Sequence, residues 1–94
     1  MRFHLPSALR QWAGGNEIIE MPLAPDVRLA IGEAFMMLGH HYPGIRQRVL
    51  DEQNNIRRHV NVFVNGENVR FLEGGATLVT HDSEVWIYPA LSGG

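Results

Sequence analysis

Two kinds of reactive side chain are missing from this chain of 94 residues, which contains neither cysteine nor lysine. Without cysteine the chain can form no disulfide, bind no metal through a thiolate and use no internal thiol as a nucleophile. Its eight basic residues are all arginines, so no side chain carries a primary amine. The sequence therefore excludes functions that need thiol chemistry within the chain itself.

Long apolar runs and clusters of basic residues are missing as well. No run reaches the roughly 20 apolar residues that a membrane-spanning helix needs, and residues 1–6 lack the apolar segment of a secretory signal. The net charge is −2, whereas nucleic-acid binding usually requires a basic patch. We therefore expect a soluble, cytoplasmic protein that binds neither membranes nor nucleic acid.

The composition that remains is typical of a folded domain. Hydrophobic residues make up 45% of the chain and charged residues 19%, which argues against disorder. The length suits a single domain, residues 1–94, with one modest core.

The first half of the sequence predicts two strands followed by two helices. Residues 1–5 and 16–23 are predicted as strands, and Gly14-Gly15 between them favours a hairpin. From Asp26 onward apolar residues recur at helical spacing, until Tyr42-Pro43-Gly44 ends the pattern. A second, shorter helical stretch is predicted from Ile45 to Leu50.

The second half carries the clearest strand pattern in the chain. Residues 60–64 alternate between valines on one face and polar or aromatic residues, including Phe63, on the other. Asn65-Gly66 predicts a tight turn because both residues tolerate positive φ. Residues 69–71 are expected on the returning strand, and residues 85–88 form the last predicted strand.

This element order, β-β-α-β-β with a minor element before the final strand, predicts an α+β fold. The expected architecture is a mixed sheet of four to five strands packed on one main helix. If Val85 and Ile87 face that helix, then Trp86 and Tyr88 point to the opposite face, where Phe63 also lies. Three exposed aromatic side chains on one face would form an apolar patch, which is typical of an interface.

The chain ends in WIYPALSGG, where an apolar strand passes directly into two glycines. Loose ends usually carry polar residues, so this ending suggests a flexible functional tail, residues 90–94. Glycine has no side chain, which lets such a tail enter a narrow cleft and present the carboxyl group of Gly94. The missing lysines then have two explanations: a compositional bias of the source, or protection of an activated carboxyl group from the chain's own amines.

Several segments together resemble the ubiquitin-like β-grasp proteins of the MoaD/ThiS sulfur-carrier family. VNVFVNGENVRF is similar to the family's central strand and hairpin, and HDSEVWIYPALSGG to its final strand and tail. LRQWAGG and YPGIRQRVLDE resemble the segment after the first strand and the end of the helix. The stretch ENVRFLEGGATLVTHDSEV and the tail YPALSGG are most similar to the CysO-like branch.

The resemblance implies a sulfur carrier, a protein cosubstrate that is not itself an enzyme and binds no cofactor. A MoeB/ThiF-like enzyme would use ATP to adenylate the C-terminal carboxylate, and a persulfide or sulfide would then displace AMP to leave a thiocarboxylate. A sulfur-accepting synthase, in the CysO-like scheme a pyridoxal-phosphate enzyme, would take the sulfur for biosynthesis of cysteine or a thiolated metabolite. A JAMM-type metalloprotease is a further implied partner.

The resemblance also implies which residues act. Gly94 would carry the adenylate and the thiocarboxylate, with Gly93 beside it. Arg10 and Tyr88 match family positions at the activating-enzyme interface, and Leu91 matches an apolar tail position that enters the partner's cleft. The expected partner-binding residues are Arg10, Phe63, Trp86, Tyr88, Leu91 and Ser92.

Three alternatives stay open. The first is the small subunit of a molybdopterin synthase. The second is a ubiquitin-like modifier that forms isopeptide bonds through Gly94, and the third is an interaction module whose terminal glycines take part in no reaction. A metal site is not expected, because His40 and His41 are adjacent and diverge on a helix, and the remaining histidines lie in separate elements.

Overall fold

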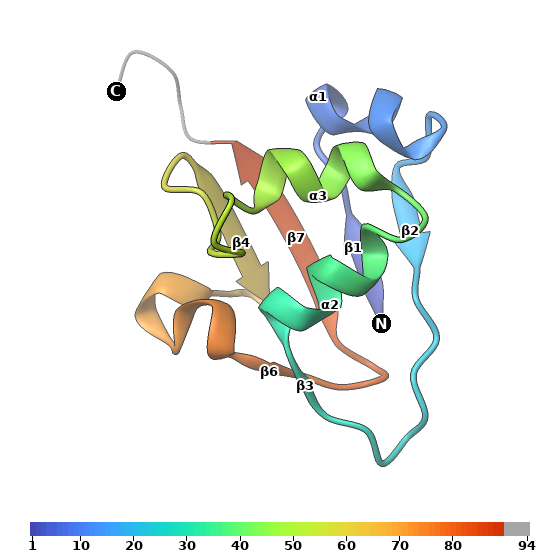
Figure 1. The fold of residues 1–94 in the computed structure, drawn as a ribbon. Helices are drawn as coiled ribbons and strands as arrows, with labels where there is room; N and C mark the ends of the chain where they lie inside the picture. The colour runs from blue at the N-terminus through green and yellow to red at the C-terminus, as the bar shows by residue number, and fades with distance from the viewer. Residues whose placement is uncertain (90–94) are drawn as a thin grey trace.

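The computed structural model describes residues 1–89, which fold into a main sheet with helices on one face and a small second sheet (Figure 1). The 3₁₀ helices are labelled η. Along the chain the elements are β1 (Arg2–His4), α1 (Ser7–Arg10), η1 (Gln11–Ala13), β2 (Ile18–Glu20), β3 (Leu29–Ala30), α2 (Ile31–Leu38), α3 (Pro43–Val49), β4 (Val60–Val64), β5 (Glu67–Asn68), η2 (Val69–Phe71), η3 (Gly74–Ala76), β6 (Leu78–Val79) and β7 (Glu84–Pro89).

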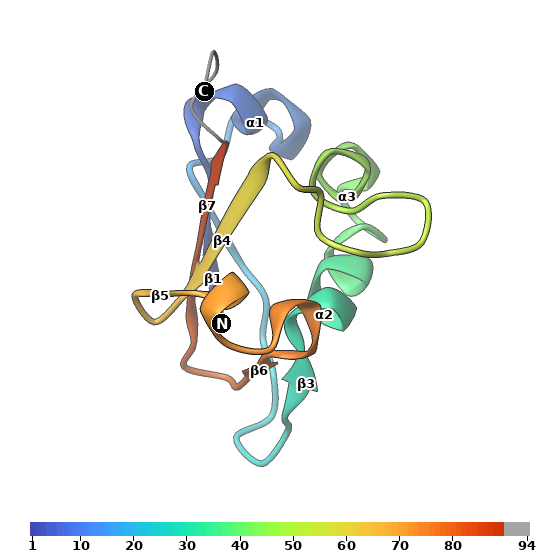
Figure 2. The ribbon, with the colours of Figure 1, turned by 90° about the vertical axis from the view of Figure 1, so that its left-hand side faces the viewer.

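The main sheet is mixed and has five strands in the order β2-β1-β7-β4-β5. β1 and β7 pair in parallel at its centre, and the neighbouring pairs are antiparallel. Figure 2 shows this sheet nearly edge-on, with α2 and α3 on one side of it. The predicted mixed sheet and the hairpin of β1 and β2 are confirmed, and Gly14 and Gly15 take φ values of 63° and 84° in its connection.

The core lies between the inner face of the main sheet and the two helices. Phe3 of β1 and Phe35 of α2 are fully buried, with ring centroids 5.4 Å apart. Val60, Val62 and Val64 are buried as their alternation predicts. Burying each such side chain stabilises the fold by about 1.5–3 kcal/mol, so the sheet and helices hold each other in place.

The predicted start of the main helix, at Asp26, is wrong. Residues 29 and 30 form β3, which pairs with β6, and the helix begins only at Ile31. The backbone amide of Ile31 donates to the carbonyl oxygen of Thr77 at 2.8 Å. Apolar residues before Ile31 fit a helical and an extended pattern equally, and pairing with β6 decides between them.

The predicted helix stop is only partly right. α2 ends at Leu38, four residues before Tyr42, and Pro43 occupies the first turn of α3. Proline suits this position because its missing amide hydrogen would have no partner there. The sequence Tyr42-Pro43-Gly44 thus begins the second helix, which ends near the predicted boundary at Val49.

The return strand after Asn65-Gly66 is shorter than predicted. The turn itself forms, with φ values of 50° and 89°. However, only residues 67–68 pair with β4, and residues 69–71 turn into a 3₁₀ helix. The side chain of Asn68 caps this helix by accepting a hydrogen bond from the Arg70 amide at 2.9 Å. Val69 is buried in consequence, while Phe71 is 87% exposed.

A helical segment that the predicted hairpin does not include lies between β1 and β2. It comprises α1 and η1, and its Trp12 packs on α3. The guanidinium carbon of Arg48 lies 3.4 Å from the centroid of the Trp12 ring, a cation–π contact. Gly44 permits this approach, because a side chain there would collide with the indole.

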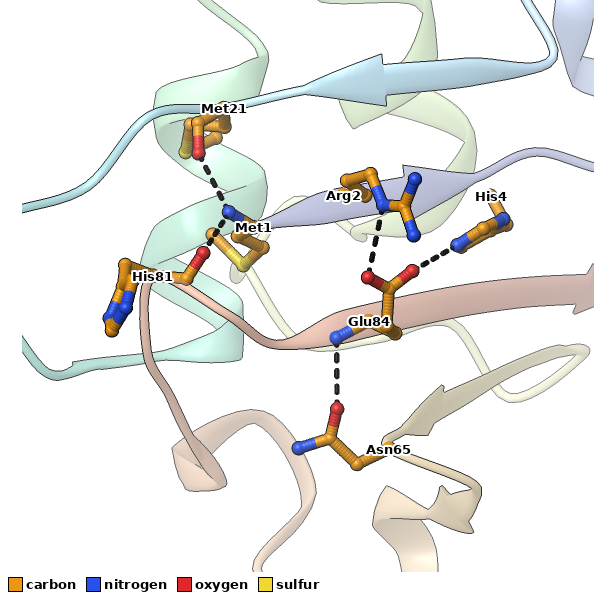
Figure 3. Close-up of polar contacts among 7 residues, drawn as sticks. All are labelled: Met1, Arg2, His4, Met21, Asn65, His81 and Glu84. Carbon is orange, nitrogen blue, oxygen red and sulfur yellow. Dashed lines mark hydrogen bonds and ion pairs between the residues drawn. The ribbon is translucent and has the colours of Figure 1, made fainter. Parts of the chain in front are cut away.

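Glu84 joins three parts of the main sheet (Figure 3). Its carboxylate accepts from Arg2 Nε at 3.0 Å and from His4 Nε2 at 2.5 Å, both on β1. Its backbone amide donates to Asn65 Oδ1 at 2.9 Å, in the turn after β4. The pKa of Glu84 is held below its usual value, first by the hydrogen bond from His4 and then by that from Arg2.

The start of the sequence is tied to two other segments (Figure 3). The amine of Met1 donates to the carbonyl oxygen of Met21 at 3.1 Å and to that of His81. Met1 is buried, and its own carbonyl oxygen accepts from the Met21 amide at 2.9 Å. These bonds hold the loop before β7 against β1. Across residues 1–89, no helix has both the length and the apolar character that crossing a bilayer requires.

We predict that Gly44→Ala destabilises the protein. Alanine normally favours a helix over glycine by about 1 kcal/mol, but here the added Cβ would lie 2.7 Å from Trp12 Cε3. Overpacking of this kind costs about 1–3 kcal/mol, so the thermal midpoint should fall by several degrees. Gly75→Ala is the matched control, because nothing lies within 4 Å of its Cβ position. An unchanged midpoint for Gly44→Ala would show that the contact is not tight.

We also predict a pH dependence from Glu84. Because folding lowers its pKa, the ionised carboxylate stabilises the fold above the pKa of the unfolded chain, and this contribution disappears as pH falls through the folded value. In urea titrations, wild type should therefore lose more stability than Glu84→Gln between about pH 5 and pH 3. Glu52→Gln, which removes an exposed carboxylate outside the ion pairs of residues 1–89, should behave as wild type. Equal losses in wild type and Glu84→Gln would contradict the assignment.

Candidate functional site

Three aromatic side chains gather on the outer face of the main sheet, away from the helices. Phe63 of β4 pairs directly with Trp86 of β7. Tyr88 meets Phe63 edge-on, with ring centroids 5.6 Å apart, and lies parallel to Trp86 at 6.2 Å. We call Phe63, Trp86 and Tyr88 the aromatic patch.

The exposure of the patch confirms the predicted division of β7 between two faces. Val85 and Ile87 are buried, while Trp86 and Tyr88 are 40% and 46% exposed. No loop or helix among residues 1–89 covers them fully. Exposed apolar side chains that occur singly are normal, whereas Trp86 and Tyr88 are neighbours and Tyr88 also meets the half-buried Phe63. Such a cluster of aromatic rings on one face is typical of an interface.

His4 extends the patch, although it is not among the predicted site residues. The parallel register of β1 and β7 sets His4 opposite Trp86. Their rings stack with centroids 3.8 Å apart and planes 6° apart, while the hydrogen bond to Glu84 holds the imidazole in place. These contacts hold Trp86 in one orientation, and a side chain that is already oriented loses less entropy in any binding event. The alternation of residues 1–5 puts His4 on the outer face, but only the strand order brings it beside Trp86.

Arg10 contacts the segments that follow β1 and precede β2. Its Nε donates to the carbonyl oxygen of Leu5 at 3.2 Å, and its Nη2 lies 3.6 Å from Glu17 Oε1. These contacts place the side chain at the junction of β1, α1 and β2. Its predicted role in binding an activating enzyme stays a prediction.

The last described residue, Pro89, pairs with Val60 at the end of β7. Because β1 and β7 run in parallel, the helix that follows β1 lies at the same edge of the sheet as Pro89, as Figure 1 shows. The predicted tail, residues 90–94, lies outside the described residues. So do the site residues predicted within it, which are Leu91, Ser92, Gly93 and Gly94.

The described part of the chain offers no metal-binding cluster. Within residues 1–89, no group of three or more histidine, aspartate or glutamate side chains is arranged to hold a metal ion. The pKa of Asp82 is lowered chiefly by a hydrogen bond from the Thr80 hydroxyl, and that of Glu84 is lowered as described above. Both carboxylates are occupied by structural partners.

Comparison with known proteins gives consistent matches along the chain. The model of the ThiS family matches residues 4–94. The sulfur carrier protein CysO of Mycobacterium tuberculosis is 34% identical over 92 residues, which span 96% of this chain and 94% of the relative. Small archaeal modifier protein 3 of Haloferax volcanii is 33% identical over 64 residues, or 68% of each chain.

A solved structure supports the same assignment. A chain of the Amycolatopsis orientalis BexX/CysO complex superposes with a TM-score of 0.84 at 29% identity, covering 99% of this chain and 98% of that one. The expected ubiquitin-like β-grasp fold is confirmed by this likeness, and so is the resemblance to the CysO-like branch. Proteins of this kind act with partner enzymes and are not catalysts themselves. The chain therefore belongs to the ThiS family and is a sulfur carrier protein.

Proposed function

We propose that this carrier holds sulfur as a thiocarboxylate on Gly94 and delivers it in biosynthesis. The observation that carries the proposal is that the family match runs through residue 94 and so includes the terminal Gly93-Gly94. The support from the described residues is that β7, the strand leading to this segment, also bears Trp86 and Tyr88. One strand would then both bind a partner and lead to the carboxyl group that reacts.

The first chemical step is activation, because a carboxylate is a poor electrophile. A carboxylate oxygen of Gly94 attacks the α-phosphorus of ATP, and pyrophosphate leaves. The product is an acyl adenylate. We assign this step to a MoeB/ThiF-like enzyme, with ATP bound by that enzyme and not by the carrier.

In the second step a sulfur nucleophile replaces AMP. Hydrosulfide attacks the acyl carbon, and AMP leaves with the electron pair of the carbon–oxygen bond that breaks. The product loses a proton to become the thiocarboxylate. No cysteine or lysine side chain of the carrier can intercept the acyl adenylate, so the activated group is left for the external sulfur.

A second partner then takes the sulfur. We propose a pyridoxal-phosphate enzyme that binds a carbon electrophile, which the thiocarboxylate sulfur attacks. Hydrolysis of the resulting thioester would return the carrier with its carboxylate. If an amino group of the acceptor first attacks the acyl carbon and displaces the sulfur as a thiol, a JAMM-type metalloprotease would hydrolyse the peptide bond so formed. These enzymes are cytoplasmic in the proposal, and the carrier would work in that compartment.

A second candidate function is protein modification. The observation that favours it is the 33% identity to a small archaeal modifier protein. In that case the activated Gly94 would acylate lysines of other proteins. Immunoblots of cell extracts would then reveal conjugates of higher mass, whereas a carrier used for sulfur transfer alone would run as a single species.

We predict that the C-terminus gains sulfur under defined conditions. The protein is incubated with its activating enzyme, ATP and sulfide, and its intact mass is measured. The mass should rise by the difference between a sulfur and an oxygen atom. Gly94→Val should not react, because its side chain obstructs the cleft that must close around the tail, whereas the remote Gly75→Ala should react normally. Equal conversion of Gly94→Val, or no gain by wild type, would refute the thiocarboxylate.

We also predict that the aromatic patch binds the activating enzyme. Tyr88→Ala should lower kcat/KM for carrier-dependent adenylation about 10-fold or more, because buried aromatic residues dominate interface energies. Phe71→Ala is the matched control, since Phe71 is an exposed aromatic residue outside the patch. The patch has no such role if the two variants react alike while their thermal midpoints equal that of wild type.

A further inference from the structure

A groove opens at the edge of the main sheet where β7 ends. Its apolar lining, which we call the apolar floor, includes Leu9 of α1, Val60 of β4, and Ile87 and Pro89 of β7. The volume is about 740 Å³, which is enough for more than one side chain. Because Pro89 lines it, the groove lies directly at the point from which residues 90–94 lead on.

The rim of this groove is basic. Arg48 of α3, Arg57 and His59 line it together with the apolar floor, and no aspartate or glutamate does. Within residues 1–89 neither arginine takes part in an ion pair. The local charge is therefore positive, although the chain as a whole carries a net charge of −2.

The two guanidinium groups are held in place by backbone oxygens. Arg57 Nε donates to the carbonyl oxygen of Gln47 at 3.0 Å. Arg48 Nη1 donates to that of Gly44 at 3.2 Å while its guanidinium covers the Trp12 ring. Each arginine keeps other N–H groups for an additional acceptor, since a guanidinium has five donors. Charged donors already oriented beside an apolar floor favour a ligand with a carboxylate next to an apolar side chain.

We infer that this groove receives an apolar side chain flanked by carboxylates from the enzyme that adenylates Gly94. The inference rests on the proposed function. An enzyme that encloses residues 90–94 must approach the chain at Pro89, so the groove falls within its reach. The aromatic patch lies on the other face of β7, and the enzyme would therefore hold the end of the sheet from both sides.

Position and charge favour this occupant over the two others that the groove could take. The carrier's own tail begins at the groove, but it must lie in the enzyme's active site during adenylation, which leaves the groove open to the enzyme. A second copy of the chain would bring a repeat of the same positive rim. Binding to the enzyme uses both the apolar floor and the unpaired positive charge.

The test measures carrier-dependent adenylation, by pyrophosphate exchange, for variants of the groove. Arg57→Glu should lower kcat/KM about 5-fold or more by raising KM, because like charges at an interface oppose association. Added salt should also lower the kcat/KM of Arg57→Glu less than that of wild type. Arg28→Glu makes the same change in charge on an exposed residue that precedes β3 and lies outside the groove, and it should react as wild type.

A second variant separates recognition from folding. His59 is exposed, and its side chain forms no hydrogen bond within residues 1–89, so His59→Glu should keep the wild-type thermal midpoint and still raise KM. His40→Glu is its control, an exposed histidine outside the groove. If wild type is adenylated while Arg57→Glu and His59→Glu match their controls, this inference fails and the proposed function stands. If wild type is not adenylated, both fail.

Two further measurements detect the other occupants. If deletion of residues 90–94 shifts the NMR signals of the His59 ring in the free protein, the groove holds the carrier's own tail, which overturns the inference. If light scattering shows a dimer that Arg57→Glu dissociates, the groove holds a second copy, which also overturns it. A monomer with unchanged His59 signals supports binding of the enzyme.

Discussion

The parallel pairing of β1 with β7 is the contact on which the rest of this structure depends. It brings the first and the last strand of residues 1–89 together at the centre of the main sheet. It also sets His4 against Trp86 and both Arg2 and His4 against Glu84. Parallel strands end at the same edge of a sheet, so α1 and Pro89 lie close together there. The groove beside Pro89 depends on this arrangement, because residues of α1 and Pro89 both line it.

Strand β7 gives each of its two faces a separate task. Its inner residues, Val85 and Ile87, complete the hydrophobic core, and its outer residues, Trp86 and Tyr88, form most of the aromatic patch. A shift of one residue in its register would exchange the two sets and would place both tryptophan and tyrosine in a core that has no room for them. The packing of the core therefore also determines which side chains of β7 face outward in the aromatic patch.

Local patterns predicted the features that depend on neighbouring residues in the chain. Alternation located β4 and β7 and assigned their faces, and Gly14-Gly15 and Asn65-Gly66 located the turns before β2 and after β4. The start of α2 and the short β5 were missed because distant partners decide them, β6 in one case and the Asn68 cap in the other. The stack of His4 on Trp86 was missed for the same reason, since it follows from strand order, which alternation does not contain.

A carrier must dissociate from each enzyme once the reaction is complete. The two surfaces beside Pro89, the aromatic patch and the basic groove, suit this requirement. The aromatic patch offers apolar contact, which contributes most to affinity at an interface. The basic groove offers charge, which acts mainly on the rate and orientation of encounter and is weakened by salt. Because His4 and backbone carbonyl oxygens hold these side chains in place beforehand, little conformational entropy is lost on binding. Modest contacts on a rigid body can therefore select a partner and still release it, while in the proposed function the reacting carboxyl group belongs to Gly94.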